Sequence, residues 1–118
     1  MEENFPSSLT YRKYGAIVTK GTALKPWAGN KPPRVCETSS GMLNAIGLQN
    51  PGVEYFLQNE LKFLKDSGAT VIVNAIGKTM EDYVEVCRIL NKEDIDGIEL
   101  NLSCPNVKER MSCIWNNI

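Results

Sequence analysis

The feature that most restricts the fold of this chain is a nearly uninterrupted apolar run, ATVIVNAIG, at residues 69–77. A strand with one face in water alternates apolar and polar residues, whereas a strand covered on both faces is apolar throughout. Two more runs share this character: GAIVTKG at residues 15–21, bounded by glycines, and the weaker IDGIELNL at residues 95–102. The three runs predict parallel strands that are covered on both faces.

The segments between these strands have the periodicity of helices. Before the second run, apolar residues recur at three- and four-residue steps, at Val53, Phe56, Leu57, Leu61 and Leu64. Gly68 is a typical stop for that helix. After the second run, Thr79 is a candidate N-cap, and Asp82 follows three residues later in a pattern close to a capping box. The apolar face predicted for this second helix consists of Met80, Tyr83, Val84, Cys87 and Leu90. The order strand–helix–strand–helix–strand predicts an α/β fold with right-handed crossovers.

The connection at residues 22–52 is too long to be a plain crossover. It is rich in Pro, Gly, Asn and Ser, and connections of this length without secondary structure are usually functional or disordered. Its apolar parts, Trp27 and MLNAIGL at residues 42–48, argue against disorder. We therefore expect an ordered loop that holds a ligand.

Length and charge restrict the function further. The chain has 118 residues, enough for one domain, and a formal net charge of −1 from 13 basic and 14 acidic residues. This balance offers no basic surface for nucleic acid or for an anionic membrane. No apolar stretch reaches the roughly 20 residues of a membrane helix, and the start lacks the layout of a signal peptide. We expect a cytoplasmic protein that binds neither nucleic acid nor membranes.

The chain contains no histidine, and its four cysteines form no C-x-x-C pair. Zinc or iron–sulfur ligation by a standard ligand set is therefore not expected, and any proton transfer must use Cys, Lys, Asp, Glu or Tyr. We expect free thiols. Cys36, Cys87 and Cys113 are interpreted as packing residues, whereas Cys104, in NLSCPNV, is open to four interpretations: packing residue, metal ligand, disulfide partner or reactive thiol.

Polar residues stand where the three predicted strands end. Lys20, Asn74 and Asn101 occupy these ends, and Cys104 follows the last of them. Parallel strands bring their carboxyl ends to one edge, where open α/β sheets and barrels bind ligands. The pattern predicts a pocket shared by a lysine, two amides and a thiol. Taken singly, each has another interpretation: a solvated lysine, turn-forming asparagines or a packed cysteine.

Three stretches carry a resemblance to a known family. They are GAIVTKGTALKPWAGNKPPRVCETSSGMLNAIGLQNPG, VIVNAIGKTMEDYVEV and IELNLSCPNVKE, within residues 11–109. They closely resemble dihydroorotate dehydrogenases, and ETSSGMLNAIGLQNPG is similar to the class 1B catalytic subunit. The resemblance implies a fragment of a (β/α)8 TIM barrel with FMN at the carboxyl ends of its parallel strands. It also implies oxidation of dihydroorotate to orotate in pyrimidine (UMP) biosynthesis.

The resemblance implies a role for each matching residue. Cys104 matches the catalytic base, and the flavin contacts match Lys20, Gly21, Asn74 and Asn101. The substrate contacts match Lys20, Asn44, Ala45, Ile46, Gly47, Leu48, Asn101 and Asn106. A base is required because one ring carbon loses a proton while its neighbour loses a hydride, which the flavin accepts. The family also implies a partner subunit that carries FAD and an iron–sulfur cluster and passes electrons to NAD.

The chain also departs from the family. A complete barrel takes about 250 residues, so we expect residues 1–118 to form a partial domain that covers the second to fourth strands. The start MEENFPSSLT does not match the first-strand flavin contact, the flavin-phosphate site is expected elsewhere, and residues 110–118 form a divergent tail. We expect the isolated chain to be marginally folded, prone to aggregation or dependent on a complementary fragment. The alternatives are a non-catalytic remnant, an interaction fragment and a flavin domain similar to dihydropyrimidine dehydrogenase.

Overall fold

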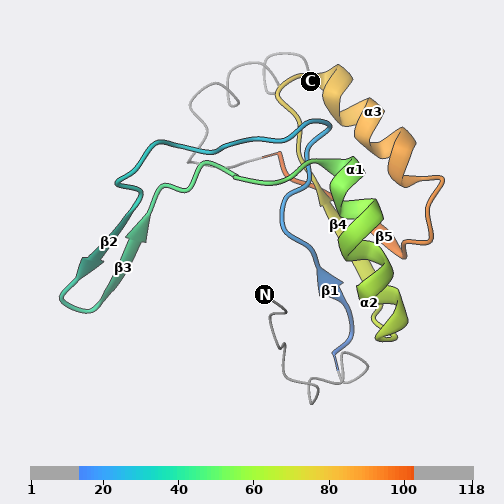
Figure 1. Ribbon diagram of the computed structural model, residues 1–118, viewed down its shortest axis with the longest axis horizontal. Helices are drawn as coiled ribbons and strands as arrows, with labels where there is room; N and C mark the ends of the chain where they lie inside the picture. Colours follow the sequence, from blue (N-terminus) through green and yellow to red (C-terminus); the bar gives the residue numbers. More distant parts are fainter. Residues whose placement is uncertain (1–13, 103–118) are drawn as a thin grey trace.

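The computed structural model describes residues 14–102 of the chain. Its elements follow one another in this order: β1 (Ile17–Val18), β2 (Val35–Thr38), β3 (Gly41–Asn44), α1 (Val53–Tyr55), η2 (Phe56–Leu61), α2 (Lys62–Asp66), β4 (Val71–Ala75), α3 (Met80–Leu90) and β5 (Gly97–Leu100) (Figure 1). Cys104, Asn106 and the predicted tail at residues 110–118 lie outside the described residues.

The three predicted strands form one parallel sheet in the order β1-β4-β5. Ile17 pairs with Val71 on one side of β4, and Val73 pairs with Ile98 on the other. β1 is shorter than its apolar run, but a parallel bridge from Thr22 continues its pairing to the end of β4. The prediction of a parallel α/β sheet is confirmed over the described residues.

Within residues 14–102, the helices cover one face of this sheet. Val71, Val73 and Ala75 alternate along β4, so they share a face, and all three are 0% exposed. Residues from both helical segments join them in one core: Val53, Phe56, Leu61, Val86 and Leu90. On the opposite face of β4, Ile72 and Asn74 are half-buried. The sequence predicts strands covered on both faces, and the described residues cover one face of β4 fully and leave the other half-buried.

The first helical segment spans α1, η2 and α2 without interruption. Val53, Phe56 and Leu61 are buried and Leu57 and Leu64 half-buried, as the periodicity predicts. Its central six residues are a π-helix, in which the hydrogen bonds span five residues; this is also the separation of the two core residues Phe56 and Leu61.

None of the helices within residues 14–102 is long and apolar enough to cross a lipid bilayer.

Helix α3 begins where the sequence predicts, but its buried face differs from the prediction. Thr79 and Asp82 form the expected capping box. The side chains that face the sheet are Tyr83, Val86 and Leu90, whereas the predicted Met80 and Val84 are 52% and 48% exposed and Cys87 is half-buried. Helix α3 thus has two neighbouring rows of apolar residues. Tyr83, Val86 and Leu90 form the row that packs against the sheet, and Met80 and Val84 belong to the other. The predicted face was therefore rotated from the observed one.

The long connection is ordered, and it contains a hairpin that its sequence pattern does not predict. β2 and β3 pair in antiparallel register from Val35 opposite Asn44 to Thr38 opposite Gly41. The hairpin extends away from the parallel sheet, and all eight of its strand residues are exposed (Figure 1). Cys36 lies on this hairpin as an exposed free thiol, so its interpretation as a packing residue is wrong.

Candidate active site at the carboxyl ends of the strands

The sheet brings Asn74 and Asn101 together, as the pattern of strand ends predicts, and Gly21 lies beside them. Thr22, next to Gly21, forms a bridge with Ala75, and the backbone N of Asn101 donates to Ala75 O at 3.0 Å. A Cβ on Gly21 would lie 3.2 Å from Asn74 Oδ1. Ile76 Cγ2 would lie 3.1 Å from the same Cβ, and Gly21 is buried, so glycine lets the end of β1 pack closely against the Asn74 amide and Ile76.

The two asparagine amides are joined to each other and to a carboxylate. Asn101 Nδ2 donates to Asn74 Oδ1 at 3.3 Å, and Asn74 Nδ2 donates to Glu99 Oε1. Asn74 and Asn101 are half-buried, and Glu99 is exposed. Sequence reasoning missed Glu99, although its signal is present: it stands two residues before Asn101, and alternate residues of a strand share a face. This row of amide and carboxylate groups is called the amide cluster below.

Lys20 stands beside this cluster at the end of β1. Two threonines hold its carbonyl oxygen: Thr19 Oγ1 donates to it at 3.1 Å and Thr22 Oγ1 at 3.0 Å. Thr19 Oγ1 also accepts from the backbone N of Asn74 at 3.2 Å, which ties the ends of β1 and β4 together. Lys20 is exposed, and within residues 14–102 it forms no ion pair. Its ammonium group is therefore available to an anionic ligand.

The predicted substrate segment, residues 44–48, follows β3. Asn30 holds it from inside the loop, because Asn30 Nδ2 donates to Ala45 O at 2.8 Å and Asn30 N donates to Ile46 O at 2.9 Å. Ile46, Gly47 and Leu48 are half-buried, whereas Asn44 and Ala45 are exposed. Among the described residues, no hydrogen bond joins this segment directly to Lys20, Asn74 or Asn101.

Trp27 connects the long loop to the carboxyl end of β4. Lys78, in the turn after β4, lies over the Trp27 ring at 5.4 Å from its centroid. Such a contact is an electrostatic attraction between the ammonium and the ring face. Trp27 also exchanges two backbone hydrogen bonds with Asn50, at 2.9 and 3.1 Å. The loop is thus attached to the edge of the sheet that carries the amide cluster, as expected for a loop that helps to form a ligand site.

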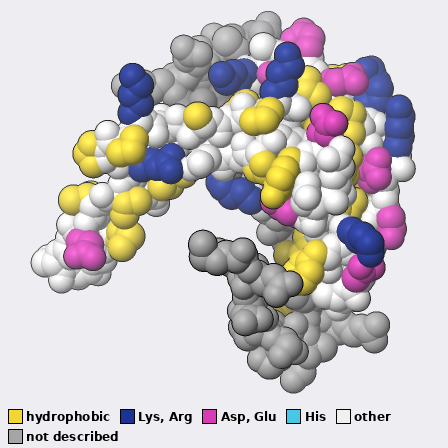
Figure 2. Space-filling view, in the orientation of Figure 1, with side chains coloured by type: hydrophobic (Ala, Val, Ile, Leu, Met, Phe, Trp, Pro, Cys, Tyr) yellow, Lys and Arg dark blue, Asp and Glu magenta, His cyan; other side chains and the backbone are white. Residues whose placement is uncertain are grey.

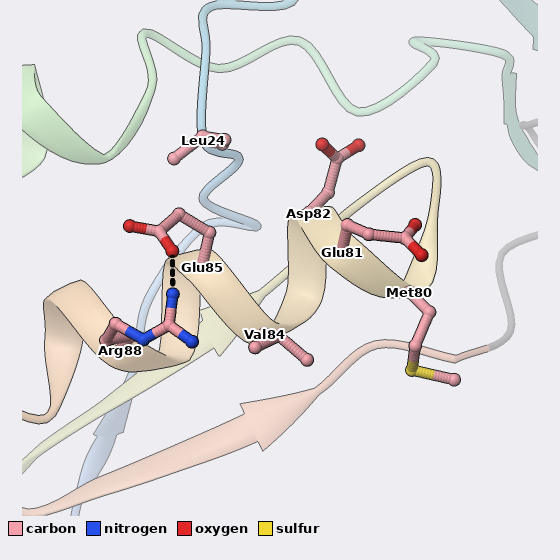
Figure 3. Close-up of a pocket in the computed structure, with 7 residues that line it drawn as sticks. All are labelled: Leu24, Met80, Glu81, Asp82, Val84, Glu85 and Arg88. Carbon is pink, nitrogen blue, oxygen red and sulfur yellow. Dashed lines mark hydrogen bonds and ion pairs between the residues drawn. The ribbon is translucent and has the colours of Figure 1, made fainter.

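A groove of about 420 Å³ lies elsewhere, along the outside of α3 (Figure 3). Leu24 contributes to it from the segment after β1, and the other lining residues belong to α3: Met80, Glu81, Asp82, Val84, Glu85 and Arg88. Arg88 forms an ion pair with Glu85 inside the groove. None of the predicted site residues within residues 14–102 lines it, so it is separate from the amide cluster.

The clearest ion network lies at the opposite, amino-terminal end of the strands. Asp96 accepts from the backbone N of Val71 at 2.8 Å and from Lys65 Nζ at 3.1 Å. The backbone hydrogen bond, followed by the one from Lys65, lowers the pKa of the Asp96 carboxyl group below its ordinary value. The hydrogen bond to Asp96 in turn raises the pKa of Lys65. In barrels this end of the strands serves stability, whereas ligands bind at the other.

Comparison with known proteins agrees with this geometry. The family model described as dihydroorotate dehydrogenase matches residues 1–116. The relatives include the catalytic subunit of dihydroorotate dehydrogenase B (NAD(+)) from Lachnoclostridium phytofermentans, 52% identical over 89% of this chain and 37% of that protein. The corresponding subunits from Alkaliphilus metalliredigens and Alkaliphilus oremlandii are 48% and 54% identical over 92% and 80% of this chain.

These matches cover 31 to 38% of the relatives, so the chain spans about a third of their length. The matched part includes the ends of all three parallel strands and the amide cluster between them. The resemblance drawn from the sequence is confirmed: the chain belongs to the dihydroorotate dehydrogenase family.

Proposed function

We propose that this chain supplies part of the active site of an FMN-dependent enzyme that oxidises dihydroorotate to orotate in pyrimidine biosynthesis. The observation that carries the proposal is the contact between Asn74 and Asn101 at the carboxyl ends of adjacent parallel strands, beside Gly21. Ligands bind at this edge in parallel α/β folds. In the complete enzyme, the three-stranded sheet is part of a (β/α)8 barrel.

The residues present fit the flavin ring of FMN. One edge of the ring carries carbonyl oxygens and an N–H group, and asparagine amides both donate to and accept from such groups. Gly21, with no side chain, lets the end of β1 pack closely against Asn74 and Ile76, which fixes the place of the Asn74 amide. We assign Lys20, Gly21, Asn74 and Asn101 to this cofactor. When bound, FMN supplies the acceptor for the hydride that leaves the substrate.

The remaining roles belong to the substrate. The Lys20 ammonium neutralises the dihydroorotate carboxylate, and Asn101, Asn106 and residues 44–48 hold the ring through hydrogen bonds to its amide edges. Cys104 Sγ, as a thiolate, takes the proton from one ring carbon while the neighbouring carbon loses a hydride, which leaves the C=C bond of orotate. A thiolate can take up this proton where its pKa is lowered or the site excludes water. Cys104 and Asn106 enter the proposal from their sequence match.

We include a partner subunit in the proposal. The relatives bear the name of a catalytic subunit of an NAD(+)-linked dehydrogenase, which supports an additional subunit that takes the electrons onward. In this proposal that subunit carries FAD and an iron–sulfur cluster and reduces NAD. The free thiols of Cys36 and Cys87 are typical of a reducing compartment and support a cytoplasmic location.

The proposal is tested by titrating the purified chain with FMN and following flavin fluorescence. Saturable binding is expected, and Asn74→Ala should weaken it about fivefold to tenfold, as expected for the loss of one or two hydrogen bonds. Asn59→Ala is the matched control because Asn59 also makes a side-chain hydrogen bond, to Tyr55 O on an exposed helix face. No FMN binding by a chain whose circular dichroism shows it to be folded would contradict the proposal.

A further inference from the structure

Leu48 has an unusual backbone conformation. Its φ is +56°, and within residues 14–102 it is the one residue other than glycine with a positive φ. Gly47, just before it, has φ +78°, so two consecutive residues are left-handed. Leucine has no intrinsic preference for this region and adopts it only where the surroundings enforce it. Such enforced conformations concentrate at ligand sites.

The side chain of Asn50 is the group that holds Leu48 in this conformation. Asn50 Nδ2 donates to Leu48 O at 2.9 Å. Asn50 Oδ1 accepts from two backbone N–H groups, Ala23 N at 3.1 Å and Gly52 N at 3.0 Å. Asn50 is only 6% exposed, so these hydrogen bonds are shielded from water. A buried amide with both of its ends bonded is a fixed point in the structure.

This fixed point joins the substrate segment to the sheet. Ala23 lies two residues beyond Gly21, and Thr22 between them forms a bridge with Ala75 at the end of β4. Asn30, which holds the other end of the segment, belongs to the long loop itself and provides no such link. Besides the contact between Trp27 and Lys78, the Asn50 side chain therefore provides a buried, hydrogen-bonded path from residues 44–48 to the amide cluster.

We propose that Asn50 is a positioning residue for the dihydroorotate site. It keeps Leu48 left-handed and sets residues 44–48 at a fixed place relative to Lys20 and Gly21. The proposal rests on the proposed function in one respect, namely that residues 44–48 bind the substrate. Asn50 itself has no part in the chemistry, since its amide is already committed to backbone groups.

The first test measures the loop without any ligand. Asn50→Asp keeps the oxygen that accepts from Ala23 and Gly52 but removes the donor to Leu48 O. Hydrogen exchange of the whole chain, read by mass spectrometry, should become about tenfold faster at residues 45–50, with β4 and α3 within twofold of the unchanged chain. Asn59→Asp is the matched control, because Asn59 also donates to a backbone carbonyl but is exposed, and it should change nothing at residues 45–50.

Two more variants separate positioning from a general structural role. Leu48→Gly removes the cost of the positive φ, so Asn50→Asp should accelerate exchange at least threefold less in the Leu48→Gly background. Asn50→Ser loses the same donor without adding a carboxylate. If Asn50→Asp and Asn50→Ser both lose protection equally throughout the chain, Asn50 only maintains the fold, and the proposal is overturned.

The second test uses orotate as the probe on the FMN-loaded chain. Asn50→Asp should raise the Kd of orotate about tenfold and change the Kd of FMN less than twofold, because residues 44–48 are assigned to the substrate alone. Unchanged orotate affinity together with faster loop exchange would overturn the proposal. If the unaltered chain binds FMN but no orotate, the proposed function is contradicted, and hydrogen exchange alone then decides whether Asn50 positions the loop.

Discussion

Gly47 is the residue on which the shape of the segment after β3 depends most directly. A Cβ at this position would lie 2.8 Å from both Cγ and the backbone N of Asn30. That backbone N donates to Ile46 O, so Asn30 cannot move aside without losing the hydrogen bond. A side chain at residue 47 would meet a left-handed backbone and an occupied space at once.

We therefore expect Gly47→Ala to lower the free energy of unfolding by about 1–3 kcal/mol. Gly41→Ala is the control within the same connection, because its Cβ would meet nothing closer than Thr38 Oγ1 at 3.8 Å. Urea titrations followed by circular dichroism measure both variants. Equal losses of stability in the two would show that the positive φ and the Asn30 contact do not matter.

Some of the site is readable from single residues and some is not. Asn74 and Asn101 each end an apolar run, and the ends of parallel strands share an edge, so their meeting can be predicted. The left-handed Leu48 cannot, because nothing in a leucine favours that conformation. It depends on Asn50, whose side chain is fixed by Ala23, 27 residues away. A contact over that distance is a product of the whole fold.

At the level of secondary structure, Asp96 connects three elements at the amino-terminal end of the sheet. Its carboxylate accepts from the first residue of β4, it stands just before β5, and it pairs with Lys65 of α2. The folded chain lowers its pKa, so the unfolded chain binds the proton more readily. The stabilisation is therefore present above the ordinary pKa of an aspartate and is lost as the pH falls through the lower, folded value.

The expected result is a loss of stability below about pH 4 that depends on Asp96. Urea midpoints measured from pH 7 down to pH 3 should fall less steeply in Asp96→Asn than in the unaltered chain, and Asp96→Asn should already be less stable at pH 7. Asp66→Asn serves as the control, because Asp66 forms an exposed ion pair with Lys62 on α2, the helix that also carries Lys65. If the urea midpoints of all three chains fall equally with pH, Asp96 does not cause the loss of stability in acid.

The elements themselves were predictable where burial imposes a period. The strands of the parallel sheet and both helical segments appear where their apolar residues recur, and the capping box marks the start of α3. The β2–β3 hairpin was not predictable, because both of its faces are exposed and no alternation results. Its turn, Ser39–Ser40, is also not one of the glycine-containing pairs that mark two-residue hairpins.

At the level of the whole molecule, apolar side chains are exposed on the β2–β3 hairpin, as the left-hand arm in Figure 2 shows. Met42 and Leu43 are 62% and 66% exposed, and as neighbours in a strand they point to opposite faces of the hairpin. A two-stranded hairpin with both faces in water gains little from its own contacts. Exposed apolar surface of this kind promotes association between chains.

We expect Met42→Ser combined with Leu43→Thr to leave the free energy of unfolding within about 0.5 kcal/mol of the original, because these side chains bury little. The same pair should reduce light scattering at high protein concentration. Val73→Ala, at a residue that is 0% exposed in the core, should cost about 2 kcal/mol and serves as the comparison. If the double variant Met42→Ser, Leu43→Thr lowers the free energy of unfolding as much as Val73→Ala, the hairpin packs against the rest of the chain.

The two neighbours of β4 close loops of very different length, and this sets an order of assembly. The contact between Thr19 and Asn74, from β1 to β4, spans 55 residues, whereas Val71 and Asp96, from β4 to β5, are 25 apart. Each doubling of a loop costs roughly 0.6 kcal/mol more entropy. We expect β4, α3 and β5 to form the nucleus and β1 to join last. In pulse-labelling hydrogen exchange during refolding, the amides of β5 should gain protection before those of β1.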